Sequence, residues 1–581
     1  MTAPNRNALW ARTLVDELAA GGVSAVVVSP GSRSTPLTMA FARHDDVTVY
    51  SQLDERSAAY FALGRARRTG EVTPLVCTSG TAAANYHPAV IEASQSRVPL
   101  LALTADRPPE LRDSGANQTI DQEKLYGDSV RWYRDLPEPE ADERKLRSLR
   151  TTAARALAAA TGTPAGPVHL NVPFRKPLEP VEVEGDVPPD LDSLASEGRD
   201  GAFVSRSTGA PELDDRELSK VADALEADRG LIVAGPADAP GVDREAVAAL
   251  AHATGFPIVA DPLSGLRFGG HVRTTTVLGG YDAYLDEAAV GDWPDPEVVF
   301  RFGASPTSKA LRKYLAATDA RQLLVDPAGE WREAEFAATD LVVAEPSRLA
   351  GRLSRLVRGG SDPAWRERWE TAERLHWEAV DEAEFHEGLL LAEVTERAPE
   401  PTTLYVSNSM PVRDLDRYGR PRAASYTALG NRGASGIDGV TSAALGAGSA
   451  TRDHLTLVTG DLAYYHDMNG LLALERCGVD ATVVLINNDG GGIFHKLPIE
   501  SFEPEFTEQF RTPHGLDFEP TGDLYGFPFE RVDPAEFGEA YAEAVAAGGT
   551  RVLEVQTDAE SSHRVRERLR ERVIERVAAE T

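Results

Sequence analysis

The feature that most restricts the fold is a series of short apolar runs, rich in β-branched residues, that end in small or turn-forming residues. Four such runs occur in the first third of the chain, at residues 23–31, 72–80, 98–106 and 166–174. Helix-length segments separate them, which is typical of a parallel sheet covered by helices. Similar runs follow at 229–240, 298–308, 322–327, 403–409, 454–461, 481–488 and 550–558. The sequence therefore predicts an α/β fold with three consecutive parallel-sheet domains.

Composition suggests where these domains end. With 581 residues, the chain is too long for a single hydrophobic core. Residues 177–201 are rich in Pro, Glu and Asp, as linkers are, and a weaker break follows at 358–363. We therefore predict a first domain over residues 1–180, a linker over 181–205, a central domain over 206–358 and a third domain over 359–581.

The charge balance argues against several classes of partner. The chain carries 60 Lys and Arg residues against 91 Asp and Glu residues, a net charge of −31. A surface this acidic repels nucleic acid and anionic membranes, so neither is an expected partner. The seven lysines are Lys124, Lys145, Lys176, Lys220, Lys309, Lys313 and Lys496. High acid content with little lysine resembles proteins of halophilic organisms, and we expect a halophilic protein.

The expected location is the cytoplasm. Cys77 and Cys477 are the only cysteines, and each lies within an apolar run, which favours two buried, reduced thiols. No stretch approaches the roughly 18 unbroken apolar residues of a membrane span. The sequence also shows no long apolar run of the kind found in signal peptides.

One segment carries a strong chemical signal, and it lies between residues 458 and 494. Gly460 and Asp461 end one apolar run, and Asn488 ends the next, one strand–helix–strand unit later. Both side chains are then expected at the carboxyl ends of parallel strands, where open α/β sheets bind ligands. A carboxylate, an amide oxygen and the backbone carbonyl of Gly490 form an oxygen set that suits Mg²⁺ when phosphate and water complete it. The glycines at 490–492 would let the backbone approach a diphosphate closely.

This segment resembles the GDG…NN signature of thiamine-diphosphate enzymes, with Leu462 in place of the third glycine. That departure argues against the decarboxylase and acetolactate synthase branches of the superfamily. These enzymes also need a glutamate beside the cofactor's pyrimidine, and Glu55 in LDERS (53–57) resembles it, followed by TSGTAAANYHPAVIEA at 78–93. The resemblance implies thiamine diphosphate and Mg²⁺ or Mn²⁺ as cofactors. It also implies a homodimer or homotetramer, because the family pairs the first domain of one subunit with the last domain of another.

Further motifs resemble the branch of this superfamily that joins 2-oxoglutarate to isochorismate in menaquinone biosynthesis. They are SPGSRSTPL (29–37), TADRPPELRDSGANQTIDQ (104–122), NRGASGIDG (431–439) and NNDGGGIF (487–494). By this resemblance the chain is a transferase that decarboxylates 2-oxoglutarate and adds the succinyl carbanion to isochorismate in a 1,4 fashion. Both substrates are dianions, for which the planar guanidinium groups of the motifs are well suited.

The resemblance also assigns roles to individual residues. The expected catalytic residues are Glu55, Arg33, Gln118 and Arg413. The expected cofactor-binding residues are Glu55, Asn117, Ile437, Gly460, Asp461, Asn488, Gly490, Gly491, Ile493 and Phe494. Of these, the metal ligands would be Asp461, Asn488 and Gly490. Isochorismate would be held by Ser32, Arg33, Arg107, Gln118 and Lys309. The distal carboxylate of 2-oxoglutarate would be held by Ser409, Arg413 and Arg432. An apolar wall that excludes water would consist of Ile493, Phe494 and Leu497. Some relatives have an arginine directly after the lysine at 309, where this chain has Ala310.

Two other functions stay open on the sequence alone. The first is another thiamine-diphosphate lyase or decarboxylase that acts on pyruvate-like substrates. The arginines at 33, 107, 413 and 432 argue against it, because small monoanions need fewer cations. The second is a non-catalytic protein that binds thiamine diphosphate, and the presence of both Glu55 and Asp461 argues against that function.

Overall fold

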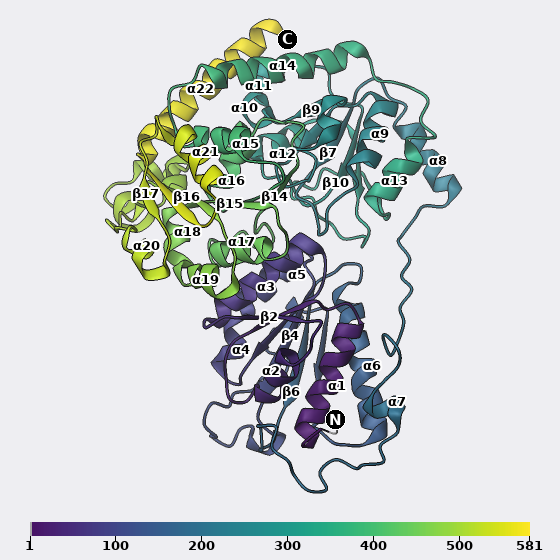
Figure 1. Cartoon of the computed structure of the whole chain (residues 1–581). Coiled ribbons are helices and arrows are strands. Elements are labelled where there is room, and N and C mark those ends of the chain that lie inside the picture. Colours follow the sequence, from purple (N-terminus) through teal and green to yellow (C-terminus); the bar gives the residue numbers. More distant parts are fainter. Residues whose placement is uncertain (1–2) are drawn as a thin grey trace. The chain divides into compact units, whose positions relative to one another are not determined.

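Three six-stranded sheets form the framework of the protein in the computed structural model, which describes residues 3–581 (Figure 1). Within each sheet, every pair of neighbouring strands is parallel. Helices lie between most successive strands, although residues 326–339 join two strands without a helix. The predicted fold class, three consecutive parallel α/β sheets, is confirmed.

The first sheet has the strand order β2-β1-β3-β4-β6-β5. Its strands are β1 (Ala25–Val28), β2 (Thr48–Ser51), β3 (Thr73–Cys77), β4 (Leu100–Asp106), β5 (Trp132–Asp135) and β6 (Pro167–Pro173). The accompanying helices are α1 (Arg6–Ala20), α2 (Thr35–Ala42), α3 (Glu55–Thr69), α4 (Thr81–Asn85), α5 (His87–Gln95), α6 (Glu143–Ala160) and α7 (Ser193–Ser196). The central strands β1, β3, β4 and β6 are buried along their whole length, as their unbroken apolar sequences predict.

The second sheet has the order β12-β11-β10-β7-β8-β9. Its strands are β7 (Gly230–Ala234), β8 (Ile258–Ala260), β9 (Val277–Leu278), β10 (Val298–Phe302), β11 (Arg321–Val325) and β12 (Asp340–Val342). The accompanying helices are α8 (Asp215–Ala224), α9 (Arg244–Thr254), α10 (Tyr281–Tyr284), α11 (Glu287–Val290), α12 (Lys309–Ala317), α13 (Pro346–Leu353) and α14 (Pro363–Asp381).

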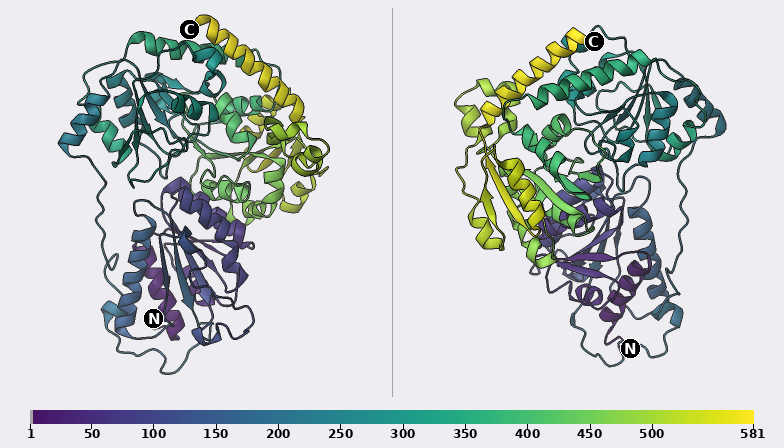
Figure 2. Two further views of the ribbon diagram at one scale, coloured as in Figure 1. Left: turned by 180° about the vertical axis from the view of Figure 1, so that it is seen from behind. Right: turned by 45° about the horizontal axis from the view of Figure 1, so that its top comes forward.

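The third sheet has the order β14-β13-β15-β16-β18-β17. Its strands are β13 (Thr402–Val406), β14 (Tyr426–Leu429), β15 (His454–Gly460), β16 (Thr482–Asn487), β17 (Phe529–Arg531) and β18 (Arg551–Gln556). The helices are α15 (Gly388–Arg397), α16 (Met410–Tyr418), α17 (Val440–Gly448), α18 (Asp461–His466), α19 (Ala473–Cys477), α20 (Pro520–Tyr525), α21 (Phe537–Ala547) and α22 (Ala559–Glu580). The long C-terminal helix α22 packs along α14, as both views of Figure 2 show.

Contacts divide the chain into two compact units, and these do not follow sequence order. Unit 1 contains the first sheet, with the chain up to Thr208, together with the segments Asn431–Arg452 and His466–Val479. Unit 2 contains the other two sheets, with the segments Gly209–Gly430, Asp453–Tyr465 and Asp480–Thr581. The boundaries predicted from the sequence at residues 180, 205 and 358 stay a prediction. The three sheets divide the chain in one way and the two compact units divide it in another.

The predicted linker is part of the packing of unit 1. Apart from α7 it is irregular, but Val183 donates its backbone N–H to Pro4 (3.0 Å), and the Asn5 side chain donates to Val181 (2.9 Å). Ala195 is fully buried in the core of the first sheet. This segment therefore lies first against the residues that precede α1 and then, through α7, against α6.

Unit 1 depends on a close crossing of α3 and α17. The small residues Gly64 and Gly446 lie where the two helices meet. A Cβ on Gly64 would be 1.8 Å from the backbone oxygen of Ala443, and a Cβ on Gly446 would be 1.9 Å from that of Phe61. Both distances are far inside van der Waals contact, so only glycine allows the helix backbones to approach this closely.

Polar contacts support the same crossing. The buried carboxylate of Asp467 accepts hydrogen bonds from the backbone N–H (2.6 Å) and hydroxyl (3.0 Å) of Ser442 and from the hydroxyl of Ser57 (3.4 Å). Glu92 of α5 accepts from the backbone N–H groups of Gly433 (2.9 Å) and Ala434 (2.6 Å). Burial raises the pKa of Asp467 to about 6, against the effect of its hydrogen bonds from Ser442.

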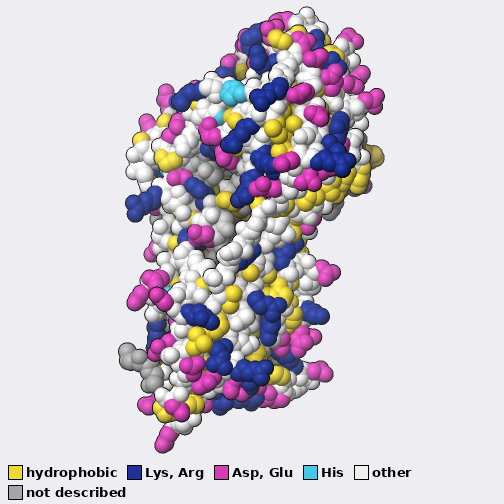
Figure 3. Space-filling model, turned by 90° about the vertical axis from the view of Figure 1, so that its right-hand side faces the viewer, with side chains coloured by type: hydrophobic (Ala, Val, Ile, Leu, Met, Phe, Trp, Pro, Cys, Tyr) yellow, Lys and Arg dark blue, Asp and Glu magenta, His cyan; other side chains and the backbone are white. Residues whose placement is uncertain are grey.

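The acidic side chains visible on one face of the molecule do not gather into a single patch (Figure 3). On the face shown in Figure 3, acidic side chains are spread widely and interleaved with basic ones. Within residues 3–581, no helix combines the length and apolar content needed to cross a bilayer. Cys77 and Cys477 are both free thiols; Cys77 is buried as predicted, but Cys477 is only partly buried.

The helix crossing gives a stability prediction. We expect Gly446→Ala to lower the free energy of unfolding by about 1–3 kcal/mol, because the new methyl group would overlap the Phe61 carbonyl. The steric cost should outweigh the roughly 0.5–1 kcal/mol that alanine normally gains over glycine in a helix. Chemical denaturation at constant KCl measures the change. Gly209→Ala is the matched control, since a Cβ at Gly209 meets nothing within 4 Å, and its change should stay within about 0.5 kcal/mol. Equal unfolding curves for the two variants would contradict the proposed role of the crossing.

Candidate active site

Asp461 and Asn488 lie side by side at the carboxyl ends of the neighbouring strands β15 and β16. Asp461 is buried, and its Oδ2 accepts hydrogen bonds from the backbone N–H groups of Asn488 (3.1 Å) and Gly490 (3.0 Å). Its Oδ1 accepts from the N–H of Leu462 (2.6 Å). The structure thus brings Gly460, Asp461, Asn488 and Gly490 together as the sequence spacing predicts.

The side-chain amide of Asn488 is oriented by a buried chain of polar contacts. Its Nδ2 donates to Glu387 (2.9 Å), which also accepts from Thr557 (2.8 Å) and pairs with Arg566 (2.9 Å). Arg566 in turn pairs with Asp414 (2.6 Å). With Nδ2 engaged in this way, Oδ1 of Asn488 is buried and has no hydrogen-bond partner. A buried acceptor without a partner is costly, which indicates that another group normally satisfies it.

These atoms fit a divalent cation. Burial raises the pKa of Asp461, although hydrogen bonds from Gly490 and Leu462 oppose this, so a cation would stabilise the charged carboxylate. The unpartnered Asn488 Oδ1 is a second hard oxygen ligand. Within residues 3–581, no group of three or more His, Cys, Asp or Glu side chains could hold a metal. A cation here would therefore take further ligands from backbone, ligand or water oxygens.

The glycine turn after β16 is covered by the loop that contains Arg511. Gly490 has φ of +140°, and a Cβ there would be 2.1 Å from the backbone oxygen of Arg511, which accepts the N–H of Gly491 (2.7 Å). The absence of a side chain at Gly490, which is expected to let the backbone approach a diphosphate, thus also lets it pack against this loop. Phe494 stacks edge-on with Phe510 at 5.6 Å between ring centroids.

His514, from the same covering loop, reaches the Asp461 site. Its Nε2 lies 3.3 Å from Oδ2 of Asp461, and its Nδ1 lies 3.5 Å from Asp489. No spacing in the sequence indicates this contact, because His514 follows Asp461 by a strand, several helices and an irregular loop. His514 is thus a residue of the candidate site that the sequence does not predict.

Glu55, in unit 1, begins α3 directly after β2. The adjacent Asp54 is the helix cap, and its carboxylate accepts from the backbone N–H groups of Arg56 (2.8 Å) and Ser57 (3.4 Å). Glu55 is therefore not needed for capping, and among residues 3–581 its carboxylate makes no hydrogen bond or ion pair. It is half-buried and close enough to raise the pKa of the Cys77 thiol, although burial of that thiol is the larger cause. A partly buried glutamate without a partner can hold or donate a proton to a ligand.

The arginines predicted in unit 1 also lie at strand ends. Arg33 follows β1 and Arg107 follows β4, and the pKa of Arg33 is lowered first by burial and then by the nearby Arg107 charge. The Nη1 of Arg33 donates to Phe174 (2.7 Å) and the Nη2 of Arg107 donates to Asn117 (2.9 Å), but Nε of each lacks a partner. Gln118 has a left-handed backbone (φ +53°) and its side chain donates to Ser79 (3.1 Å). Ser32 and Asn117 are exposed beside them.

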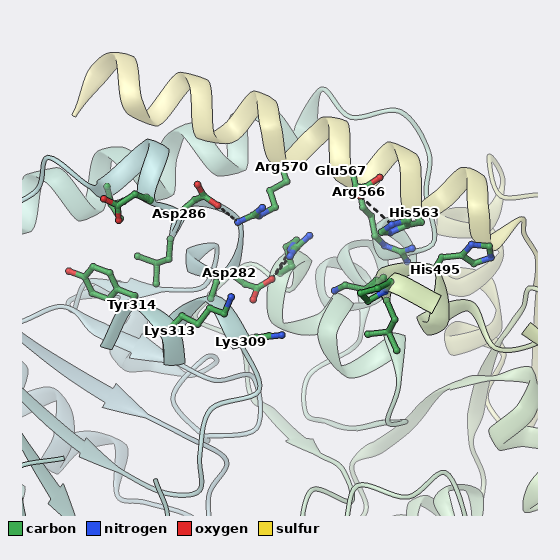
Figure 4. A pocket seen from close by; sticks show the side chains of 18 of the residues that line it. Asp282, Asp286, Lys309, Lys313, Tyr314, His495, His563, Arg566, Glu567 and Arg570 are labelled. Carbon is green, nitrogen blue, oxygen red and sulfur yellow. Dashed lines mark hydrogen bonds and ion pairs between the residues drawn. The ribbon is translucent and has the colours of Figure 1, made fainter. Parts of the chain in front are cut away.

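The remaining predicted substrate residues are divided between the units. In unit 2, Ser409 has φ of +69° and its backbone oxygen accepts from Nη1 of Arg413 (2.5 Å). Lys309 and Leu497 line one pocket of about 840 Å³ in the same unit (Figure 4). Arg432 and Ile437 belong to unit 1. The structure thus groups Ser409 with Arg413 and Lys309 with Leu497, while Arg432 falls in the other unit.

Comparison with known proteins defines the class. A model of the thiamine pyrophosphate enzyme N-terminal TPP-binding domain matches residues 10–125. A model of the thiamine pyrophosphate middle domain matches 211–406, and the C-terminal TPP-binding domain matches 414–555. The fold and site therefore define a thiamine-diphosphate-dependent enzyme.

Individual relatives narrow this class. The 2-succinyl-5-enolpyruvyl-6-hydroxy-3-cyclohexene-1-carboxylate (SEPHCHC) synthase of Halorubrum lacusprofundi is 66% identical over 98% of this chain and 98% of the relative. The enzyme of the same name from Haloarcula marismortui is 65% identical over 98% of both chains. That from Roseiflexus castenholzii is 48% identical over 96% of this chain and 97% of the relative. The chain belongs to the SEPHCHC synthase family of transferases, and its halophilic relatives agree with its acid-rich, lysine-poor composition.

The buried polar chain gives a prediction for cofactor binding. We expect Glu387→Gln to weaken metal-dependent thiamine-diphosphate binding by roughly 10- to 100-fold, because Arg566 loses one anionic partner and the Asn488 amide loses its orientation. Calorimetric titration of cofactor at a constant Mg²⁺ concentration measures this affinity. Glu373→Gln is the control, since Glu373 is also a buried carboxylate but accepts hydrogen bonds from Gly279, Gly280 and Tyr284 instead. If both variants bind cofactor equally well, Glu387 has no special role in the site.

Proposed function

We propose that this enzyme decarboxylates 2-oxoglutarate and adds the resulting succinyl carbanion in a 1,4 fashion to isochorismate, giving SEPHCHC for menaquinone biosynthesis. The observation that carries the proposal is the geometry of Asp461 and Asn488, present in a chain that matches SEPHCHC synthases along nearly its whole length. Bound thiamine diphosphate would supply the nucleophile for the 2-oxo group and accept the electrons left by CO₂.

The cofactor's two ends would be held by different parts of the chain. Asp461 and the Oδ1 of Asn488, with the Gly490 backbone, would bind the Mg²⁺ or Mn²⁺ that carries the diphosphate. Glu55 would share its proton with N1′ of the pyrimidine, which makes the neighbouring amino group a base. Asn117, Ile437, Gly460, Gly491, Ile493 and Phe494 would complete the cofactor site.

The substrates would be recognised by two sets of cations. Arg33 and Arg107, whose Nε atoms lack partners, would bind isochorismate carboxylates with Ser32, Gln118 and Lys309. Ser409, Arg413 and Arg432 would bind the distal carboxylate of 2-oxoglutarate. Ile493, Phe494 and Leu497 would exclude water from the carbanion. Of the proposed residues, Glu55, Arg33, Gln118 and Arg413 are the catalytic ones.

The reaction itself tests this function. Purified protein with thiamine diphosphate, Mg²⁺, 2-oxoglutarate and isochorismate should release CO₂ and form a product that carries a succinyl group, detected by mass spectrometry. Omitting isochorismate should leave at most slow CO₂ release. If pyruvate replaces 2-oxoglutarate with equal kcat/KM, the chain is instead a lyase for pyruvate-like substrates.

The proposed active form is a homodimer, or a tetramer built from two dimers, with each cofactor shared between chains. Glu55 lies in unit 1 and Asp461 in unit 2, and the family resemblance pairs these regions across subunits. Such a two-fold assembly contains two equivalent sites. Free thiols at Cys77 and Cys477 support a reducing compartment, so the proposed location is the cytoplasm.

Subunit mixing tests the shared site. Glu55→Gln and Asp461→Ala should each lower turnover to a few per cent or less, the first by removing the exchangeable proton and the second by removing the charged metal ligand. After subunit exchange, each mixed dimer should contain one intact site and one doubly defective site, so up to half of its sites should recover. Confirmed exchange without recovered activity would place both residues of each site in the same chain.

A further inference from the structure

The few lysines of this chain are not scattered at random. Seven lysines occur in 581 residues, and three of them, Lys309, Lys313 and Lys496, line the same pocket of unit 2. Lys309 and Lys313 come from the first turns of α12, and Lys496 comes from the short helix after the glycine turn at 490–492. In a chain with a net charge of −31, this gathering of cations is unexpected for a surface.

The acidic groups of the pocket are largely neutralised by arginines, some in the pocket and some beside it. Of its five acidic residues, four are in ion pairs: Asp282 with Arg417, Asp286 with Arg570 (2.6 Å), Glu500 with Arg564 (2.8 Å) and Glu567 with Arg564 (3.1 Å). The fifth, Glu287, is exposed. Figure 4 shows the Asp286–Arg570 pair on the α22 side of the pocket, and Lys309 and Lys313 together on the α12 side.

The three ammonium groups have no such partners. Among residues 3–581, the side chains of Lys309, Lys313 and Lys496 make no hydrogen bond and no ion pair. For Lys496, the surrounding protein and then the Arg417 charge lower the pKa to about 8, although Asp282 acts in the opposite sense. Cations that line a cavity without an ion-pair partner favour an anionic ligand there.

The shape of the pocket agrees with a small organic anion. Leu497 and Tyr314 contribute apolar surface beside the lysines, as a carboxylate on a carbon ring would require. Ala310, which follows Lys309 on α12, lines the pocket without a charge. The helix α12 thus has no cation directly after Lys309. Lys496, which comes from another element, adds a cation to the same pocket.

We propose that Lys496, with Lys313, joins Lys309 in binding the carboxylates of the ring substrate, isochorismate. This inference rests on the proposed function, which already places Lys309 on that substrate. It assigns to Lys496 a part in specificity for the ring substrate, at a place within electrostatic range of Arg413, which with Ser409 would bind 2-oxoglutarate.

Steady-state kinetics of the cofactor-loaded enzyme tests the assignment. Lys496→Met should raise KM for isochorismate about 10-fold, the effect of losing one moderately strong charge–carboxylate contact, and leave KM for 2-oxoglutarate within about 2-fold. Lys313→Met should act in the same direction, and Lys496→Arg should keep KM for isochorismate within about 3-fold. The assays should be run at the lowest KCl concentration at which the enzyme stays folded, because salt screens exposed charges.

The control is Lys220→Met, which removes a lysine that is paired with Glu217 on α8 and should leave both KM values unchanged. An unchanged KM for isochorismate in Lys496→Met would overturn the assignment. So would an equal rise in both KM values, or a loss of kcat alone. If the unaltered enzyme forms no succinyl product, the proposed function itself fails. Direct titration of the cofactor-loaded protein with isochorismate, without 2-oxoglutarate, then still reports whether Lys496→Met weakens binding.

Discussion

Parallel pairing is the constraint on which the site depends. In each sheet all strands run in the same direction, so every strand delivers its carboxyl end to the same edge. Residues far apart in sequence, such as Arg33 after β1 and Arg107 after β4, are brought near one another in this way. The same rule places Asp461 beside Asn488 in the third sheet. Backbone pairing thus determines which side chains can act together, before any side-chain contact is considered.

The sequence predicts the centre of each sheet better than its edges. β3 and β4 are buried on both faces, and their apolar runs identify them directly. The edge strands β2 and β5 are partly exposed, and β9 has only two residues, so none produces an unbroken apolar run. Edge strands are less fully covered by other elements, so they can contain polar residues. They therefore lack the unbroken apolar run by which buried strands are recognised. The missed strands are therefore mainly those whose burial depends on tertiary context.

Local sequence motifs predict most residues of the candidate site. Asp461 and Asn488 were predicted because their roles depend on positions at two strand ends, which spacing reveals. Glu387 was not predicted, because its role depends on contacts with Arg566 and Asn488 that are remote in sequence. His514 was missed for the same reason. Lys496 did leave a signal, since lysine is rare in this chain, but only the structure shows that three lysines share a pocket.

The crossing of α3 and α17 has a consequence for how the chain can fold during synthesis. The first sheet is complete in sequence by β6, but the helix that fits the small-residue face of α3 lies at 440–448. A nascent chain that has emerged only as far as Thr208 leaves that face uncovered on the ribosome. The core of the first sheet draws only on residues up to Ala195, so it can form early, but unit 1 is complete only after residues 431–452 and 466–479 have been made.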